Sequence, residues 1–444
     1  MSSIFVLLCL ALLLAQFALP RRYAFAPLLV AVCHFIDVPV VQVGASFTVA
    51  KLVILAGLIR ATYERRIGLS SRQPLDVLAV AWMGWAIFSG LFHSAEDYNP
   101  MMIRLSLIYD SFGAYLYARS FLKNQSDFLR FIKCLALVVI PLAALLLLEK
   151  FSAHNIYGGF GEAEVRSGHV RAAGPFSHPI LTGTFGATAF FLMVPLRAVN
   201  PRLAAAGAAA CGMIVVSSAS SGPLMALFSG LAALALWRFR TSIVWIRRGV
   251  LFGIVGLQLI MQAPVWYLMA RIDLAGGSTG WHRAELITSA LKSIGDWWLV
   301  GTDYTRQWMV HGVGWNSDQI DITNDYLQMG VWGGLPLMLL YIAVLLKSFQ
   351  LLGQRIREMR MAGDRAEFVL WCMGCSLFAH CVAFISVSYF DQSRAMFWMF
   401  VGAVPGMCAA TFDPDEVAVS NVTSGTGGLD ERSSGHPVGN VGGL

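Results

Sequence analysis

The feature that most constrains this chain is a succession of apolar segments, each about as long as a helix that crosses a bilayer. We count about thirteen such segments by the span-length rule. They fall at 2–20, 24–43, 46–60, 75–92, 101–121, 130–149, 179–197, 203–219, 222–237, 249–269, 326–346, 367–389 and 395–412. Because backbone groups in lipid must bond within the spanning structure, these segments predict helices. The expected fold is all-α: a polytopic transmembrane helical bundle of about 12–13 helices.

Composition excludes an ordinary soluble domain. Hydrophobic residues make up 57% of the chain and charged residues 13%, whereas soluble domains carry about 25% charged residues. The net charge of +6 comes from Lys and Arg in short connections, which indicates membrane orientation rather than nucleic-acid binding. The eight cysteines lie in apolar segments, where a thiol behaves as a small hydrophobe, so no disulfide framework is predicted.

The chain is predicted to divide into a transmembrane domain at 1–412 and a tail at 413–444. The tail is rich in Gly and Ser and poor in large apolar residues, which predicts a disordered cytoplasmic segment. At the other end, Arg21 and Arg22 follow the first apolar run instead of preceding it. We therefore expect a retained first helix rather than a cleaved signal. Prolines and a charge interrupt the second segment, which is predicted to be short or re-entrant.

Lysine and arginine occupy every second connection, namely 21–22, 60–72, 119–133, 197–202, 238–248 and 347–365. Such connections stay in the cytoplasm. The intervening connections at 93–100, 150–178, 217–222, 270–325 and 390–394 are then expected to face the other side. In a bacterium that side is the periplasm, and the predicted location is the inner membrane.

The outward connections at about 150–178 and 270–325 are long, and loops of such length are commonly functional. Apolar residues recur within 280–294 at the spacing of one helical face. They are Ala284, Ile287, Leu291 and Ile294. This pattern predicts an amphipathic helix that ends at Gly295, lies at the membrane surface, buries this face and holds Arg283 above the bundle.

Arginines gather on the predicted outer face, at Arg166, Arg171, Arg283, Arg306 and Arg394. The guanidinium group offers a rigid fork of donors that matches phosphate, and it keeps its charge in a low dielectric. Paired arginines from the two long loops suit the binding of a membrane-embedded diphosphate. The alternative is that these arginines reach to water or pair with acidic residues such as Glu164. Arg104 lies inside an apolar segment and is a further substrate-binding candidate, unless it also extends to the outer membrane surface.

Several stretches together resemble the O-antigen ligase and O-antigen polymerase family of integral-membrane proteins. They are GAYLYARSFLKNQSDFLRFIKCLALVVIPLAALLLLEKF at 113–151, RAAGPFSHPILTGTFGA at 171–187, SSASSGPLMALFSG at 217–230, WHRAEL at 281–286 and TNDYLQMGVWGGL at 323–335. Their order, spacing and placement between apolar segments carry the resemblance, which covers about residues 45–412.

The resemblance implies a glycosyltransferase that uses an undecaprenyl-diphosphate-linked glycan on the periplasmic face, with no metal and no cofactor. Arg171 matches an arginine of the family that is followed by a Gly-x-Phe and a Pro. In the family this arginine opens the helix after the first long loop. Arg283 matches the arginine on the amphipathic helix of the second. Both are implied to hold the lipid diphosphate and to stabilise the charge that develops on it.

One departure concerns the acceptor. Many family members carry a His-Asn pair before the Tyr-Leu that opens the next transmembrane helix, and this chain has Thr323-Asn324. A carboxylate or imidazole can accept the proton of a sugar hydroxyl. The candidates for this role are Asp321, Asp325 and His311, with Asn324 and Tyr326 as neighbouring substrate-binding candidates. Asn324 and Asp325 can instead cap the helix that begins at Tyr326.

We expect a polymerase that joins undecaprenyl-diphosphate-linked repeat units into a surface polysaccharide, since the missing His and the TNDYLQ…GG form favour that branch of the family. The alternatives are a ligase that transfers a finished glycan, a lipid-linked sugar transporter or flippase, and a non-catalytic scaffold. A transporter would show internal repeats and a polar site near the bilayer midplane. The expected partners are the lipid-linked glycan, the bilayer and other envelope polysaccharide-assembly proteins, and no nucleic acid.

Overall fold

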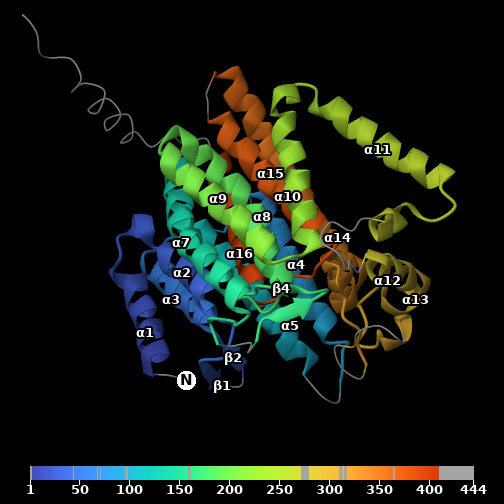
Figure 1. Cartoon of the computed structure of the whole chain (residues 1–444), viewed down its shortest axis with the longest axis horizontal. Helices are drawn as coiled ribbons and strands as arrows, with labels where there is room; N and C mark the ends of the chain where they lie inside the picture. The colour runs from blue at the N-terminus through green and yellow to red at the C-terminus, as the bar shows by residue number, and fades with distance from the viewer. Residues whose placement is uncertain are drawn as a thin grey trace, which may run out of the picture. The chain divides into compact units, whose positions relative to one another are not determined.

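The computed structural model describes residues 3–43, 45–67, 69–70, 72–95, 99–158, 162–271, 280–309, 314, 318–363 and 366–409. The predicted tail at 413–444 and His311 lie outside these residues. Within them the chain is mostly helical (Figure 1), so the all-α prediction is confirmed at that level. Two small antiparallel hairpins are the strands that this part of the chain contains.

Every predicted apolar segment coincides at least in part with a helix. The helices are α1 (Ser3–Ala18), α2 (Ala26–His34), α3 (Val49–Tyr63), α4 (Pro74–Gly90), α5 (Pro100–Ile108), α6 (Ala114–Phe121), α7 (Gln125–Ser152), α8 (Pro179–Met193), α9 (Pro201–Ser217), α10 (Ser221–Ala235), α11 (Ile243–Ile260), α12 (Gly280–Lys292), α13 (Ile294–Trp297), α14 (Asp325–Met361), α15 (Glu367–Ala383) and α16 (Asp391–Cys408). Shorter turns are η1 (Arg21–Tyr23), η2 (Tyr109–Gly113), η3 (Val194–Ala198), η4 (Leu236–Phe239), η5 (Val265–Arg271) and η6 (Arg306–Trp308).

Among the described residues, five helical stretches are long and apolar enough to cross a membrane. They are Gln125–Ser152, Pro179–Ala198, Ser221–Phe239, Ile243–Ile260 and Asp325–Met361. Shorter apolar helices occur at Phe5–Ala18, Pro74–Gly90, Pro201–Ser217 and Glu367–Ala383. The chain therefore has the helices of a membrane protein, while its orientation and number of crossings stay predictions.

Two predicted segments have different bounds in the structure. The segment at 24–43 is short, as expected, because α2 ends at His34, and the chain then forms β1 (Val41–Val43) paired with β2 (Ala45–Phe47). The segment predicted at 249–269 begins earlier, since α11 starts at Ile243, and it ends at Ile260. Residues 243–248, which include Trp245, Arg247 and Arg248, therefore belong to α11 and not to the predicted connection at 238–248.

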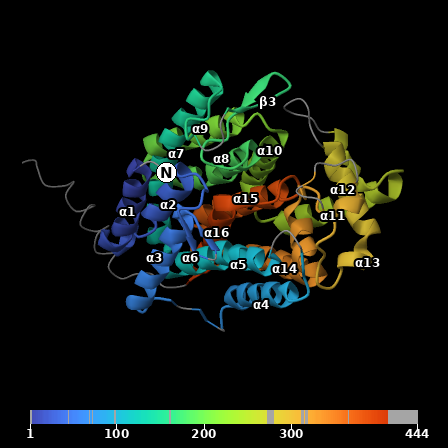
Figure 2. The ribbon, with the colours of Figure 1, turned by 90° about the horizontal axis from the view of Figure 1, so that it is seen from below.

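Helix α16 lies in the core of the bundle, packed against α6, η2 and α14 (Figure 2). Most of its residues are buried, and the ring of Trp398 lies 4.7 Å from that of Trp82 in α4. Helix α11 is the opposite case, because none of its residues is buried and it stands apart from its neighbours in Figure 1. An apolar helix that is exposed all round suits contact with lipid rather than with water.

The connections predicted to face outward contact one another. Their contacts join His93 Nδ1 to Asp303 Oδ2 at 2.8 Å, the Ala172 N–H to the Ser217 carbonyl at 3.1 Å and the Ser177 N–H to Asp391 Oδ2 at 2.9 Å. The Lys- and Arg-rich connections also contact one another. Lys123 Nζ donates to the Arg66 carbonyl at 3.3 Å, and Arg240 pairs with Glu367 at 3.2 Å. Each of α7 and α14 has a connection of one group at its first residues and a connection of the other group at its last.

Helix α14 is broken at Gly333 and Gly334, whose φ values are −157° and 74°. The break frees backbone carbonyls that buried donors then satisfy. Trp85 Nε1 donates to the Gly333 carbonyl at 2.7 Å, and Arg104 donates to the Trp332 carbonyl at 2.8 Å and 3.2 Å. Arg104 is buried and uses these donors within the protein.

Candidate functional site

The first long loop contains a hairpin that positions Arg171. Strand β3 (Glu164–Arg166) pairs with β4 (His169–Arg171), and Glu164 lies directly opposite Arg171. Ser167 and Gly168 connect the strands with φ values of 49° and 76°, the two positive values of a tight hairpin turn. Arg171 therefore ends a strand, whereas the resemblance implied that it opens a helix, and α8 begins only at Pro179.

Arg171 is held from two sides and is only 4% exposed. One terminal nitrogen donates to Glu164, and the other donates to Ser220 Oγ at 2.7 Å, while Nε has no hydrogen-bond partner. The chain after Arg171 is also fixed, because the Glu149 carboxylate accepts from the N–H groups of Ala173 and Gly174 at 2.8 Å and 3.0 Å. The guanidinium group is therefore preorganised by neighbours on α7 and in the connection before α10.

The helix predicted in the second long loop is confirmed as α12, with one difference in its bounds. It ends at Lys292, and Gly295 lies inside the short α13. Leu291 and Ile294 of the predicted apolar face are not covered by protein, so their contact with a membrane surface stays a prediction. The buried side is instead centred on Leu286 and Ala290, which join a small core with Trp297, Trp308, Ile320, Ile322, Leu327 and Val331.

Arg283 projects from the buried side of α12 and is 9% exposed. Among the described residues its Nε has no hydrogen-bond partner, and no carboxylate lies within ion-pair distance of it. Burial, together with the positive charges of Arg166 and Arg171, lowers the pKa of Arg283 to about 10, while Asp321 opposes the shift. Burial of a cation without a direct partner is costly.

Arg166, Arg171 and Arg283 form what we call the arginine cluster. All three are close enough to lower the pKa of His178, a residue that joins the cluster from the start of α8. The three positive charges repel one another. Among the described residues, the carboxylates of Glu164 and Asp321 lie nearby and offset part of this repulsion. Clustered guanidinium groups have the geometry and charge that suit the oxygens of an anion.

Asp321 lies beside the arginine cluster, near His282 and Arg283. Burial raises the pKa of the Asp321 carboxyl, and the charges of His282 and Arg283 lower it in part. Burial likewise lowers the pKa of His282, against the effect of Asp321. Of the two described residues predicted to activate an acceptor, Asp321 and Asp325, the structure brings Asp321 to the cluster.

Asp325 has a different environment. One oxygen accepts from the Tyr389 N–H at 2.9 Å and the other from the Tyr341 hydroxyl at 2.8 Å, so the buried carboxylate ties α14 to the turn before α16. Asn324 is the N-cap of α14, accepting from the Leu327 N–H at 3.0 Å, and Tyr326 donates its hydroxyl to the Cys381 carbonyl at 3.0 Å. We therefore assign these three residues to packing and capping.

The remaining predicted residues are spread over other parts of the fold. Arg394 is buried in α16, donates to the Tyr389 carbonyl and lies 4.8 Å above the Trp332 ring. Arg306 begins η6, and its backbone N–H donates to the Asp318 carbonyl at 2.8 Å. Arg104 supports the break in α14, and His311 lies outside the described residues. In the part of the chain that the structure describes, no group of three His, Cys, Asp or Glu side chains is placed to hold a metal ion.

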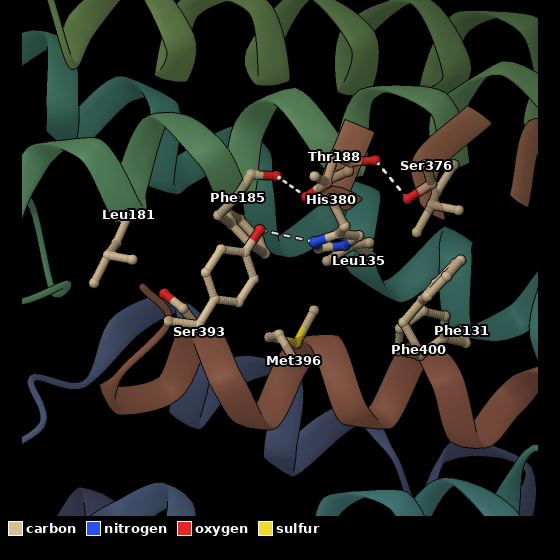
Figure 3. Close-up of a pocket in the computed structure, with 13 residues that line it drawn as sticks. Phe131, Leu135, Leu181, Phe185, Thr188, Ser376, His380, Ser393, Met396 and Phe400 are labelled. Carbon is tan, nitrogen blue, oxygen red and sulfur yellow. Dashed lines mark hydrogen bonds between the residues drawn. The ribbon is translucent and has the colours of Figure 1, made fainter. Parts of the chain in front are cut away.

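A cavity lies inside the bundle between α7, α8, α15 and α16 (Figure 3). It is lined mainly by apolar side chains, with Nδ1 of His380 lying 2.8 Å from the Tyr389 hydroxyl and Ser376 donating to the Thr188 carbonyl at 2.9 Å. The lining contains no Asp, Glu, Lys or Arg. This cavity therefore offers no charged side chain to an anion.

His178, Ser220 and Glu149 belong to the site but were not singled out from the sequence. The Ser-Gly dipeptide between Val-Arg and His-Val-Arg is the signal that would have predicted the hairpin. His178 stands directly before Pro179, the usual place of a helix N-cap. No local pattern indicates that Ser220 meets Arg171, because that contact joins residues 49 positions apart.

The chain matches no model of a known protein family, and no curated protein matches its sequence. The class of site is therefore defined by its own geometry: an arginine cluster with an adjacent carboxylate, carried by a protein whose helices are long enough to span a membrane.

Proposed function

We propose that this protein is a polysaccharide polymerase of the bacterial inner membrane that joins undecaprenyl-diphosphate-linked repeat units on the periplasmic face. The observation that carries the proposal is Arg283, a buried guanidinium without a direct partner, beside Arg166 and Arg171. The cluster belongs to the two long loops that the charge pattern assigns to the periplasm. A diphosphate linked to lipid and sugar keeps its negative charge at that surface and matches several guanidinium groups at once.

In the proposed reaction the growing chain is the donor. The hydroxyl of an incoming unit attacks the anomeric carbon, a new glycosidic bond forms, and the bond from that carbon to the diphosphate oxygen breaks. The electron pair leaves with undecaprenyl diphosphate, whose increased negative charge Arg171 and Arg283 stabilise. Because Arg171 is already fixed by Glu164 and Ser220, little reorganisation of this group is needed as the charge develops.

The acceptor side of the reaction needs a group that takes the hydroxyl proton. Asp321 is our candidate because it lies near Arg283 and because burial raises its pKa, which makes its carboxylate a better base. Asp325 is not proposed, since both its oxygens already accept hydrogen bonds. Thr323 and Asn324 stand where relatives of this type carry His and Asn, and this difference favours the polymerase over the ligase.

The broken helix α14 is the one observation that favours a transporter, because transporters bind substrates and ions at unwound helix segments. In this protein, however, the carbonyls of Trp332 and Gly333 accept from Arg104 and Trp85. The break therefore offers no free ligands at these two positions. We retain the lipid-linked sugar transporter as the second candidate, which the reconstitution in the Discussion distinguishes.

The first prediction concerns Arg171→Ala and Arg283→Ala, assayed one at a time in membranes supplied with lipid-linked repeat units. Each loses a group that binds charge formed in the transition state, so we expect the rate of chain growth to fall about 100-fold or more. Product length on a gel measures the effect, and the amount of protein in the membrane is measured alongside it.

Arg202→Ala is the matched control, because Arg202 is an exposed arginine in a connection of the opposite group. It should leave chain length unchanged. Long-chain product from a normally abundant Arg171→Ala or Arg283→Ala protein would contradict the proposed function.

A further inference from the structure

The position of His178 fixes which nitrogen of its ring carries the proton. His178 is the N-cap of α8, and its Nδ1 lies 3.1 Å from the backbone nitrogen of Ile180. A backbone N–H can only donate, so Nδ1 is the acceptor. In the neutral ring the proton is therefore on Nε2, which is the nitrogen on the side of Glu164.

Partial burial and the surrounding positive charges favour the neutral form of the His178 ring. Burial first, and then the positive charges of Arg171, Arg166 and Arg283, together lower the pKa of His178 to about 4. Glu164 opposes them. These groups come from β3, β4 and α12, so the neutral state depends on all the elements that bring charge to the ring.

The Nε2–H group has no hydrogen-bond partner among the described residues. Its nearest carboxylate oxygen is Glu164 Oε2 at 3.8 Å, whereas N–H···O bonds are about 2.7–3.2 Å long. The His178 side chain is 39% exposed, so an incoming ligand can reach this donor.

Glu164 lies between the two donors that face it. One of its oxygens accepts from Arg171, and the other faces His178. Its side chain is 41% exposed and belongs to a short hairpin. The carboxylate thus lies where an anionic ligand oxygen would meet both Arg171 and His178.

We propose that His178 is a further ligand-binding residue, whose neutral Nε2–H donates to a phosphoryl oxygen that replaces the Glu164 carboxylate beside Arg171. The inference rests on the proposed function, because it takes a diphosphate ester as the ligand. It assigns His178 to binding and excludes it as the base, since Nδ1 is occupied and Nε2 already holds its proton.

The test is the affinity of the purified full-length protein for undecaprenyl-diphosphate N-acetylglucosamine in detergent. His178→Asn keeps an oxygen that can cap α8 but is too short to replace Nε2, and we expect binding weaker by about tenfold or more. His178→Gln carries an amide N–H at the distance of Nε2 and should stay within about threefold of the wild type. Melting temperatures establish that both variants are folded.

Arg171→Ala separates failure of this inference from failure of the proposed function. If His178→Asn binds as the wild type does while Arg171→Ala binds weakly, His178 has no role in binding and the diphosphate site stands. If neither change weakens binding, both proposals fall. Equal losses in folded His178→Asn and His178→Gln would also overturn the donor role.

The pH dependence gives a second readout. The diphosphate diester keeps its charge between pH 8 and pH 5.5, and a neutral His178 does not titrate there, so the wild type and His178→Gln should show parallel affinity profiles. Other nearby groups, such as His282 and Asp321, affect both proteins alike. A gain in affinity found only in the wild type as the pH falls through about 6.5, the ordinary value for histidine, would overturn the neutral donor.

Discussion

Arg104 and Arg283 are both buried, but their guanidinium groups are used in different ways. Arg104 donates to the carbonyls of Pro100 and Trp332 at distances between 2.8 Å and 3.2 Å. Arg283 has an Nε without a partner and two other arginines nearby. The hydrogen bonds of Arg104 within the protein compensate the burial of its charge. Among the described residues Arg283 has no such bonds, and we propose that an anionic ligand takes their place.

This difference predicts opposite effects on stability. Arg104→Ala leaves buried carbonyls without donors and should destabilise the protein by about 2–4 kcal/mol, since hydrogen bonds to charged groups are the stronger ones. Arg283→Ala removes an unpaired buried charge and should be at least as stable as the wild type.

Thermal unfolding of the two purified proteins without ligand measures the difference. The interpretation fails if Arg104→Ala melts with the wild type, or if Arg283→Ala is the less stable of the pair.

At the scale of elements, the break in α14 fixes the second long loop to the bundle. The Leu335 N–H donates to the Trp298 carbonyl at 2.8 Å, and the Thr302 N–H donates to the Val331 carbonyl at 2.9 Å. Gly334 permits this because its φ is 74°, a value that residues with a side chain rarely adopt. The helix that carries Asp325 and the loop that carries Arg283 are thus joined through backbone contacts.

Gly334→Ala should therefore disturb the loop. An added Cβ would lie 2.2 Å from the Leu299 carbonyl oxygen, and the positive φ adds strain, so we expect a lower melting temperature and weaker ligand binding. Gly353→Ala in the same helix is the control, because its Cβ would meet nothing within 4 Å.

Binding and melting curves for the two variants test this account. Gly334→Ala proteins that melt and bind like Gly353→Ala proteins would show that the break is not needed.

Sequence patterns located the helices better than they described the loops between them. Apolar length is a local property, so α7 and α14 could be predicted, and the spacing around Arg283 predicted α12. The side of α12 that packs on the protein is centred on Leu286, in a cluster with Trp297 and Trp308. This packing depends on tertiary structure and could not be predicted from spacing along the helix. The neutral state of His178 depends on arginines from two distant loops, which no local pattern records.

Across the chain up to Cys408, some contacts join connections that are predicted to face outward, as His93 with Asp303 does, and others join Lys- and Arg-rich connections, as Lys123 with Arg66 does. The arginine cluster contains Arg171, which bonds Ser220 from a second connection that is predicted to face outward. Five helical stretches in the described residues have the length and hydropathy to cross a membrane. On these features we base the proposal of a reaction at the periplasmic surface on a substrate that the membrane holds.

The most direct test of the central claim is reconstitution of the purified protein in vesicles with one defined undecaprenyl-diphosphate-linked repeat unit and no nucleotide sugar. The proposal predicts products of two or more units on one lipid and release of one undecaprenyl diphosphate for each glycosidic bond formed, both lost in Arg283→Ala. Movement of the lipid-linked unit across the bilayer with no new glycosidic bond would contradict the enzyme and favour the transporter.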